Sequence, residues 1–136
     1  MKKIITFLSI IIALSICSRL NAQTVVDSSA ATVVPDKVPE FKNGLKGWAR
    51  FLESNLDTRL MMGVPAGKYT AIASFLVDSI GRVRDIYIEY DPGYGVGKEM
   101  ERILKRSSKS WVPAMANGLP VSYRHRQSLT LASNGL

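Results

Sequence analysis

The chain is poor in the side chains that perform most covalent and metal chemistry. Its 136 residues include a single cysteine, Cys17, and a single histidine, His125. Cys17 lies in an N-terminal segment typical of an export signal, so we expect a mature chain without disulfides, reactive thiols or cysteine-bound metals. His125 stands between Arg124 and Arg126, and two adjacent cations make it a poor metal ligand or general base. A surface position on a strand is the simpler interpretation of this histidine.

Other arrangements that support catalysis are also missing. The sequence contains no Gly-x-Ser-x-Gly nucleophile elbow and no spacing of residues typical of a metal site. Asp78 and Asp85 lie on either side of a predicted turn, where they are better explained as turn and bulge residues than as an acid/base pair. We therefore expect no catalytic residue, no metal ion and no cofactor, and we predict that the protein is not an enzyme.

No apolar run is long enough to span a membrane stably. The longest, residues 4–16, falls short of the ~20 residues that a bilayer requires. It follows Lys2 and Lys3 and is followed by a small residue, Ala22. A basic head, an apolar middle and a small residue at the cleavage point are the features of a secretory signal. We expect residues 1–22 to be a cleaved signal peptide.

Lipoprotein anchoring and nucleic-acid binding are both less favoured by the sequence. Anchoring as a lipoprotein through Cys17 is less favoured, because Ile16 rather than a small residue precedes the cysteine. The net charge of +7 includes three cations of the signal peptide, and the remaining excess is too modest to indicate nucleic-acid binding.

Residues 23–40 lack a sustained hydrophobic period and predict a flexible leader. The remaining residues, 41–136, are expected to form one domain around one core.

Residues 44–56, "GLKGWARFLESNL", predict an amphipathic helix. Asn43, directly before this segment, is expected to be the N-cap residue of this helix. Because one face of such a helix must be buried, we expect the apolar stripe to lie in the core. This stripe consists of Leu45, Trp48, Phe51, Leu52 and Leu56.

Residues 69–90 predict an antiparallel β-hairpin. Apolar residues alternate along its first strand, with Phe75 on the face that we expect to be buried. The stretch "DSIG" then turns the chain, and Gly81 can take the positive φ that such a turn requires. The second strand interrupts its apolar alternation, which predicts a β-bulge near Arg84 or Asp85.

Residues 98–110 predict a second helix, with acidic residues in its first turn and basic residues near its end, as the helix dipole favours. We expect Trp111 to cap the core where the chain leaves this helix and Pro113 to stiffen the exit. Asn117 and Gly118 predict a tight turn that leads to the last strand.

The last predicted strand covers residues 121–131. The order of elements is therefore helix, strand, strand, helix, strand. Two helices packed on one face of a three-stranded antiparallel sheet would close a small core, so the predicted fold class is α+β. The residues expected to define this fold are Trp48, Phe75, Gly81, Trp111, Pro113, Asn117 and Gly118.

Several short motifs follow one another in order between residues 39 and 131. They include "PEFKNG" before the first helix, "FLVDSIGRVRDIYIEYDPG" over the hairpin and "KEMERILKRSSKSWVPAMANGLPV" over the second helix and the turn. The specific signal is the ordered combination of Val77-Asp78, Gly81, Val83, Asp85, the Glu-rich helix start, Trp111-x-Pro113, Asn117-Gly118 and Pro120-Val121. In this combination the chain resembles the C-terminal domain of TonB, in the form common among Bacteroidetes.

The resemblance implies a periplasmic domain whose exposed last strand takes up a peptide of a protein partner. In TonB the partner is a segment of an outer-membrane receptor, and the domain serves energy-driven transmembrane transport. The physical basis is β-augmentation, in which the free backbone groups of an edge strand pair with an added strand. In this chain the corresponding edge comprises Val121, Ser122, Tyr123, Arg124, His125, Arg126, Gln127 and Ser128.

The chain departs from TonB in having a cleavable signal in place of a membrane anchor, and a short leader in place of a long proline-rich spacer. Even fully extended, at ~3.3 Å per residue, such a leader would be too short to cross the periplasm. We therefore expect a stand-alone, non-enzymatic protein-binding module that is associated with TonB-type transport as an adaptor rather than as a motor arm, and that does not bind nucleic acid. The alternative is a self-associating structural domain of the envelope, in which two copies pair or exchange their last strands as a homodimer.

Overall fold

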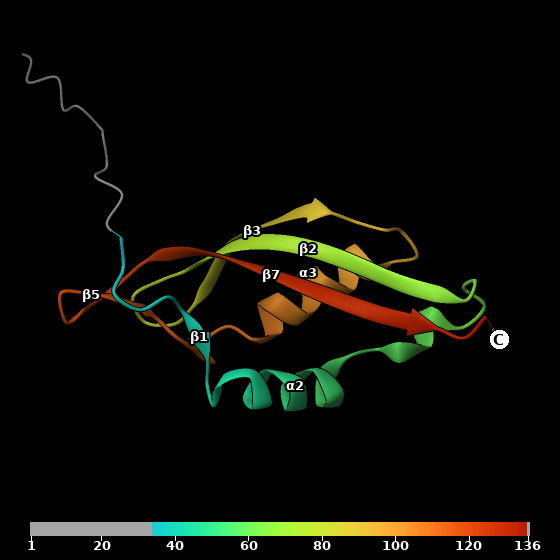
Figure 1. The fold of residues 1–136 in the computed structure, drawn as a ribbon, viewed down its shortest axis with the longest axis horizontal. Coiled ribbons are helices and arrows are strands. Elements are labelled where there is room, and N and C mark those ends of the chain that lie inside the picture. The colour runs from blue at the N-terminus through green and yellow to red at the C-terminus, as the bar shows by residue number, and fades with distance from the viewer. Residues whose placement is uncertain (1–33, 136) are drawn as a thin grey trace, which may run out of the picture. The chain divides into compact units, whose positions relative to one another are not determined.

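The computed structural model describes residues 34–135 (Figure 1). The predicted signal peptide, with Cys17, and most of the predicted leader lie outside these residues. No helix of the described part is both long and apolar enough to cross a membrane. The elements in chain order are β1 (Glu40–Phe41), α2 (Gly44–Asn55), η1 (Thr58–Met61), β2 (Gly67–Val77), β3 (Val83–Tyr90), α3 (Val96–Arg106), β4 (Trp111–Val112), β5 (Ala114–Ala116), β6 (Leu119–Val121) and β7 (Tyr123–Ser133).

The fold is α+β, as the sequence predicts. A three-stranded antiparallel sheet has the order β3-β2-β7, so β2 is central and β7 forms one edge. Two helices, α2 and α3, lie on the same side of this sheet (Figure 1). Two smaller pairs of strands, β1 with β4 and β5 with β6, complete the described elements. The sequence predicted the sheet, the two helices and a tight turn at Asn117 and Gly118, but none of these short strands.

The core lies between the sheet and the helices. Along β2 the residues Ala71, Ala73, Phe75 and Val77 are fully buried on one face, which is the predicted period of two. From α3, Met100, Ile103 and Leu104 pack against this face and are equally buried. The second helix therefore covers the sheet with the apolar stripe that its sequence indicates.

The first helix contributes an aromatic cluster to the core, but one residue of its predicted apolar stripe is exposed. Trp48 is buried as expected, whereas Leu45, which shares its predicted apolar stripe, is 86% exposed. Helical spacing places residues on one face of a helix but does not decide how much of that face other elements cover. The predicted N-cap position of Asn43 is confirmed; the residue has a left-handed conformation (φ 65°), and its side chain makes no capping hydrogen bond.

The turn between β2 and β3 follows the prediction. Asp78 accepts hydrogen bonds from the backbone N–H groups of Ile80 and Arg82 (3.1 and 2.9 Å), and Gly81 has φ 79°. A Cβ atom at Gly81 would lie 2.1 Å from the carbonyl oxygen of Trp111, so both the backbone angle and the close approach require glycine. The predicted bulge is present at Asp85, which has φ 47° where the β2–β3 register shifts.

The segment after α3 differs from the prediction. Asn117 and Gly118, both at positive φ, form a tight turn, but this turn joins β5 to β6 rather than leading directly into the last strand. The last strand, β7, begins only at Tyr123. The backbone of Met115 also contacts Lys37, so pairing begins N-terminal to residue 41, the first residue of the predicted domain.

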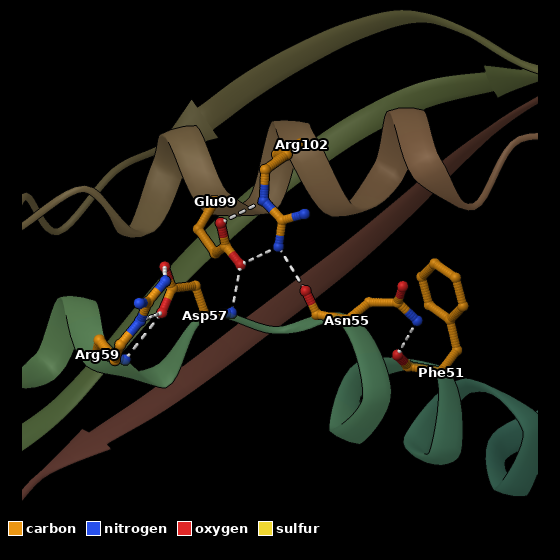
Figure 2. A network of polar contacts seen from close by, with 6 residues as sticks. All are labelled: Phe51, Asn55, Asp57, Arg59, Glu99 and Arg102. Carbon is orange, nitrogen blue, oxygen red and sulfur yellow. Dashed lines mark hydrogen bonds and ion pairs between the residues drawn. The ribbon is translucent and has the colours of Figure 1, made fainter.

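A polar network joins the end of α2 to α3 (Figure 2). The buried carboxylate of Glu99 accepts a hydrogen bond from the backbone N–H of Asp57 (2.8 Å) and bonds from the Nε and Nη2 atoms of Arg102. The same guanidinium donates to the carbonyl oxygen of Asn55, the last residue of α2. The hydrogen bonds from Arg102 hold the pKa of Glu99 below its usual value, even though burial acts in the opposite direction.

Replacing Glu99 with glutamine is expected to lower the free energy of unfolding by about 1–2 kcal/mol at pH 7, because the charge-assisted bonds from Arg102 are lost. The folded-state pKa of Glu99 lies below its unfolded value, so this contribution is present above the unfolded pKa and is lost as the pH falls through the folded one. Urea unfolding from pH 7 downward should therefore show the difference between Glu99→Gln and wild type shrinking in acid.

The matched control is Glu101→Gln. Glu101 pairs with Lys105 on the exposed side of the same helix, where ion pairs contribute little to stability. A loss of stability at Glu101 as large as that at Glu99 would contradict the assigned role of the buried network.

Candidate functional site

Strand β7 is a long and regular edge of the sheet. Its eleven residues, Tyr123–Ser133, pair with β2 in one uninterrupted antiparallel register. Within residues 34–135 no other strand pairs with its second side. Alternate backbone N–H and C=O groups on that side therefore have no strand partner, which is the arrangement that an added strand requires.

The opposite edge of the sheet, β3, is less suited to accept a strand. Its register with β2 shifts twice, and Asp85 interrupts it with a positive φ. Bulges twist an edge strand and break the repeat of its backbone groups, which is a common protection against pairing with another chain. Of the two edges of this sheet, β7 is the one with an unbroken backbone repeat.

The two faces of β7 differ in chemistry. Because its register places His125 opposite Phe75 and Leu129 opposite Ala71, the odd-numbered residues from Tyr123 to Leu131 face the same side as the core. Arg124 and Arg126 lie on the other face, together with Ser128 and Thr130. A strand paired with β7 would continue both faces.

A groove opens beside the middle of β7 on the side of the helices. It has a volume of about 280 Å³ and is mainly apolar. His125, Arg126 and Gln127 contribute from β7, while α2 contributes Leu45 and Trp48. The other lining residues are Pro39, Glu40, Phe41, Gly44 and Trp111. Leu45, the most exposed member of the predicted core stripe, thus borders the groove.

Packed aromatic rings form one wall of the groove. Phe41 contacts Trp48 and Trp111 edge-on, with ring centroids 5.3 and 5.6 Å apart, and Trp111 contacts Phe75 at 5.2 Å. The indole N–H of Trp111 donates to the buried hydroxyl of Ser107 (3.0 Å). Because these rings are held by packing and by a buried hydrogen bond, the apolar surface beside β7 is preorganised.

His125 does not occupy the simple surface position that the sequence analysis favoured. Its ring is half-buried and lies 5.6 Å from Phe75 and 5.3 Å from Trp111, between centroids. Burial lowers the pKa of His125. The signal for this orientation was in the sequence, because His125 shares its strand parity with the apolar Leu129 and Leu131, but the adjacent arginines obscured it.

The arginines on the opposite face differ in their partners. Arg126 donates from Nε to the carboxylate of Glu89 on β3 (2.6 Å), and this bond holds the pKa of Glu89 below its usual value. Arg124 donates only weakly, to the hydroxyl of Ser74 (3.4 Å) and the carbonyl of Asp85 (3.3 Å). In the described part of the chain no carboxylate lies within ion-pair distance of Arg124.

The structure places most of the predicted edge residues together. Residues 123–128 lie consecutively in β7, but Val121 belongs to β6 and Ser122 lies between the two strands. Sequence reasoning missed the contribution of residues 39–45 to the site, because their position beside β7 depends on pairing between distant segments. Among the described residues there is also no group of three side chains able to hold a metal ion.

The position of His125 predicts its titration. Because burial disfavours the charged ring, we expect a folded-state pKa below 6.5. The folded pKa is lower than the unfolded one, so His125 should subtract stability as the pH falls through the unfolded value toward the folded value. NMR titration of the tag-free protein measures this directly, since the chain has one histidine. A pKa at or above 6.5 would show that the ring is not held against Phe75 and Trp111.

Comparison with known proteins assigns no family to the chain: no protein-family model matches it, and no curated protein gives a significant match. The resemblance to the C-terminal domain of TonB therefore stays a prediction from sequence. The fold and the geometry of β7 are the observations on which a functional proposal can rest.

Proposed function

We propose that the protein is a non-enzymatic binding module of the periplasm that captures an extended segment of a partner protein on β7. The observation that carries the proposal is the unbroken edge of β7, which pairs with β2 on one side only within the described residues. Main-chain hydrogen bonds along such an edge give affinity, and pockets for alternate side chains give specificity. The groove beside His125 is such a pocket.

The chemistry of the edge favours selective rather than indiscriminate pairing. Arg124 and Arg126 place charge on one face of β7, and charged residues on edge strands discourage aggregation with arbitrary chains. The aromatic wall on the other face is fixed by its packing around Trp111. A partner must therefore match an apolar surface on one side and a basic one on the other.

The resemblance of residues 39–131 to the C-terminal domain of TonB supports a more specific form of the proposal. In this form the partner is a segment of an outer-membrane receptor in a TonB-type transport system, and the chain works as a stand-alone adaptor. The groups able to pair are those of β7, in the same place in the order of elements as the binding strand of that domain.

Proline substitution tests the role of the edge. Neighbouring residues of a strand direct their N–H groups to opposite sides, so Arg126→Pro and Gln127→Pro each remove an N–H group from a different side of β7. The variant that loses the N–H group facing β2 disrupts the sheet. The other loses an N–H group on the free side of β7 and should keep a near-native circular dichroism spectrum; it is called the folded proline variant. We expect the folded variant to lose at least tenfold in the amount of partner captured from an envelope extract, relative to wild type.

Ser122→Pro, which lies just outside β7, is the matched control and should capture the partner as wild type does. If the folded member of the proline pair captures the same protein at the wild-type level, β7 is not the binding edge.

A second candidate is self-association, because an open edge can serve an identical chain as well as a foreign one. The regular, unshifted register of β7 favours this candidate over pairing through β3. Sedimentation over a concentration series distinguishes the two: a dimer that the folded proline variant abolishes supports self-association, and a monomer throughout excludes it.

A further inference from the structure

The groove beside β7 is too small for most separate ligands but suits one side chain. Its volume of about 280 Å³ lies just below the range of about 300–1,000 Å³ typical of pockets for drug-sized molecules. One side of it is β7 itself, through His125 and its two neighbours. A strand added at this edge would thus run directly past the opening of the groove.

The pairing of a partner strand with β7 determines which side chain of the partner would enter the groove. Directly paired residues of adjacent strands point to the same face of the sheet. His125 points to the side of the helices, where the groove lies. The partner residue opposite His125 would therefore point into the groove, and its two sequence neighbours would lie opposite Arg124 and Arg126 on the other face.

The groove calls for a large apolar side chain. Its walls are mainly apolar and include the rings of Phe41, Trp48 and Trp111. Leu45 at its rim is 86% exposed, so a strand over the groove would remove apolar surface of Leu45 from water. A small or charged residue at this place would leave the groove unfilled or bury a charge without a partner.

The face of β7 that carries the arginines favours an acidic residue in the partner, at the position next to the apolar residue. Arg126 already pairs with Glu89, whereas Arg124 has no carboxylate partner within the described residues. A carboxylate on the partner, opposite Arg124, would supply one. Because Arg124 is the direct neighbour of His125, the acidic residue would be the direct neighbour of the apolar one in the sequence of the partner.

We infer that β7 selects its partner by a two-residue code, in which a large apolar residue fills the groove and the acidic residue next to it pairs with Arg124. The occupant is thus an extended segment of another protein that carries this apolar-acidic pair. This inference rests on the proposed function, since it assumes that the partner adds to β7.

Peptide display tests the inference without knowledge of the natural partner. The mature protein is used to select from a library of random ten-residue peptides. We expect enriched peptides to share a large apolar residue with Asp or Glu directly beside it. Fluorescence anisotropy then measures the affinity of an enriched peptide, of its apolar-to-alanine form and of its acid-to-amide form.

Variants of the protein and of the peptide are combined in two double-mutant cycles, one for the groove and one for Arg124. Leu45→Ala should weaken the enriched peptide at least about tenfold but leave the affinity of its alanine form nearly unchanged. Arg124→Gln should weaken the acidic peptide about threefold to tenfold and its amide form much less. The matched controls are Met62→Ala, which alters another exposed apolar side chain away from the groove, and Arg50→Gln on the exposed surface of α2.

The failures of the two proposals are distinguishable. One outcome overturns the code and leaves β-augmentation intact. In it, enriched peptides fail to bind the folded proline variant, but they carry no apolar-acidic pair, or their affinity does not depend on Leu45 and Arg124. A library that enriches nothing, or peptides indifferent to the edge proline, overturns both. Two further outcomes would assign the groove to a segment of this chain and overturn the inference. One is binding of a synthetic peptide of residues 23–33 with the same dependence on Leu45. The other is a dimer that Leu45→Ala abolishes.

Discussion

The packing of Trp111 joins the parts of this fold. Its ring contacts Phe75 of the central strand, Phe41 of β1 and Trp48 of α2. Its indole N–H bonds to Ser107 at the end of α3, and its carbonyl oxygen approaches Gly81 so closely that no side chain fits there. The sheet, both helices and the β2–β3 turn thus meet at one residue. The same ring forms part of the groove beside β7, so the site is built directly on the core.

This construction gives the edge strand two different environments. On the side of the helices, β7 adjoins a preorganised apolar surface, and on the other side it carries arginines in water. A flexible partner that binds here must lose conformational entropy, and a rigid surface reduces the additional cost of ordering the protein. The contrast with β3 is informative, because the bulge at Asp85 shortens the regular part of that edge. The two edges of one sheet thus differ in their readiness to pair.

Much of the fold could be predicted from local patterns. The alternation around Phe75, the turn at Gly81 and the bulge at Asp85 follow from the period of two and from its interruption. The strand pair β1–β4 could not be predicted, because strands of two residues have no period and pair only through long-range packing. The site was predicted only along β7. Leu45 was assigned to the core because its spacing fits a helical stripe, and its exposure depends on the distance between α2 and β7, which no local pattern encodes.

Amide hydrogen exchange along β7 shows whether the free side of this strand accepts another strand. In the free protein, protection should alternate along residues 123–131, because every second N–H group bonds to β2 and the others face away from it. When a selected peptide binds, the unprotected N–H groups of β7 should become protected, while the protection of the N–H groups of β3 should not change. Binding that leaves the exchange along β7 unaltered, or that protects another surface instead, would contradict it.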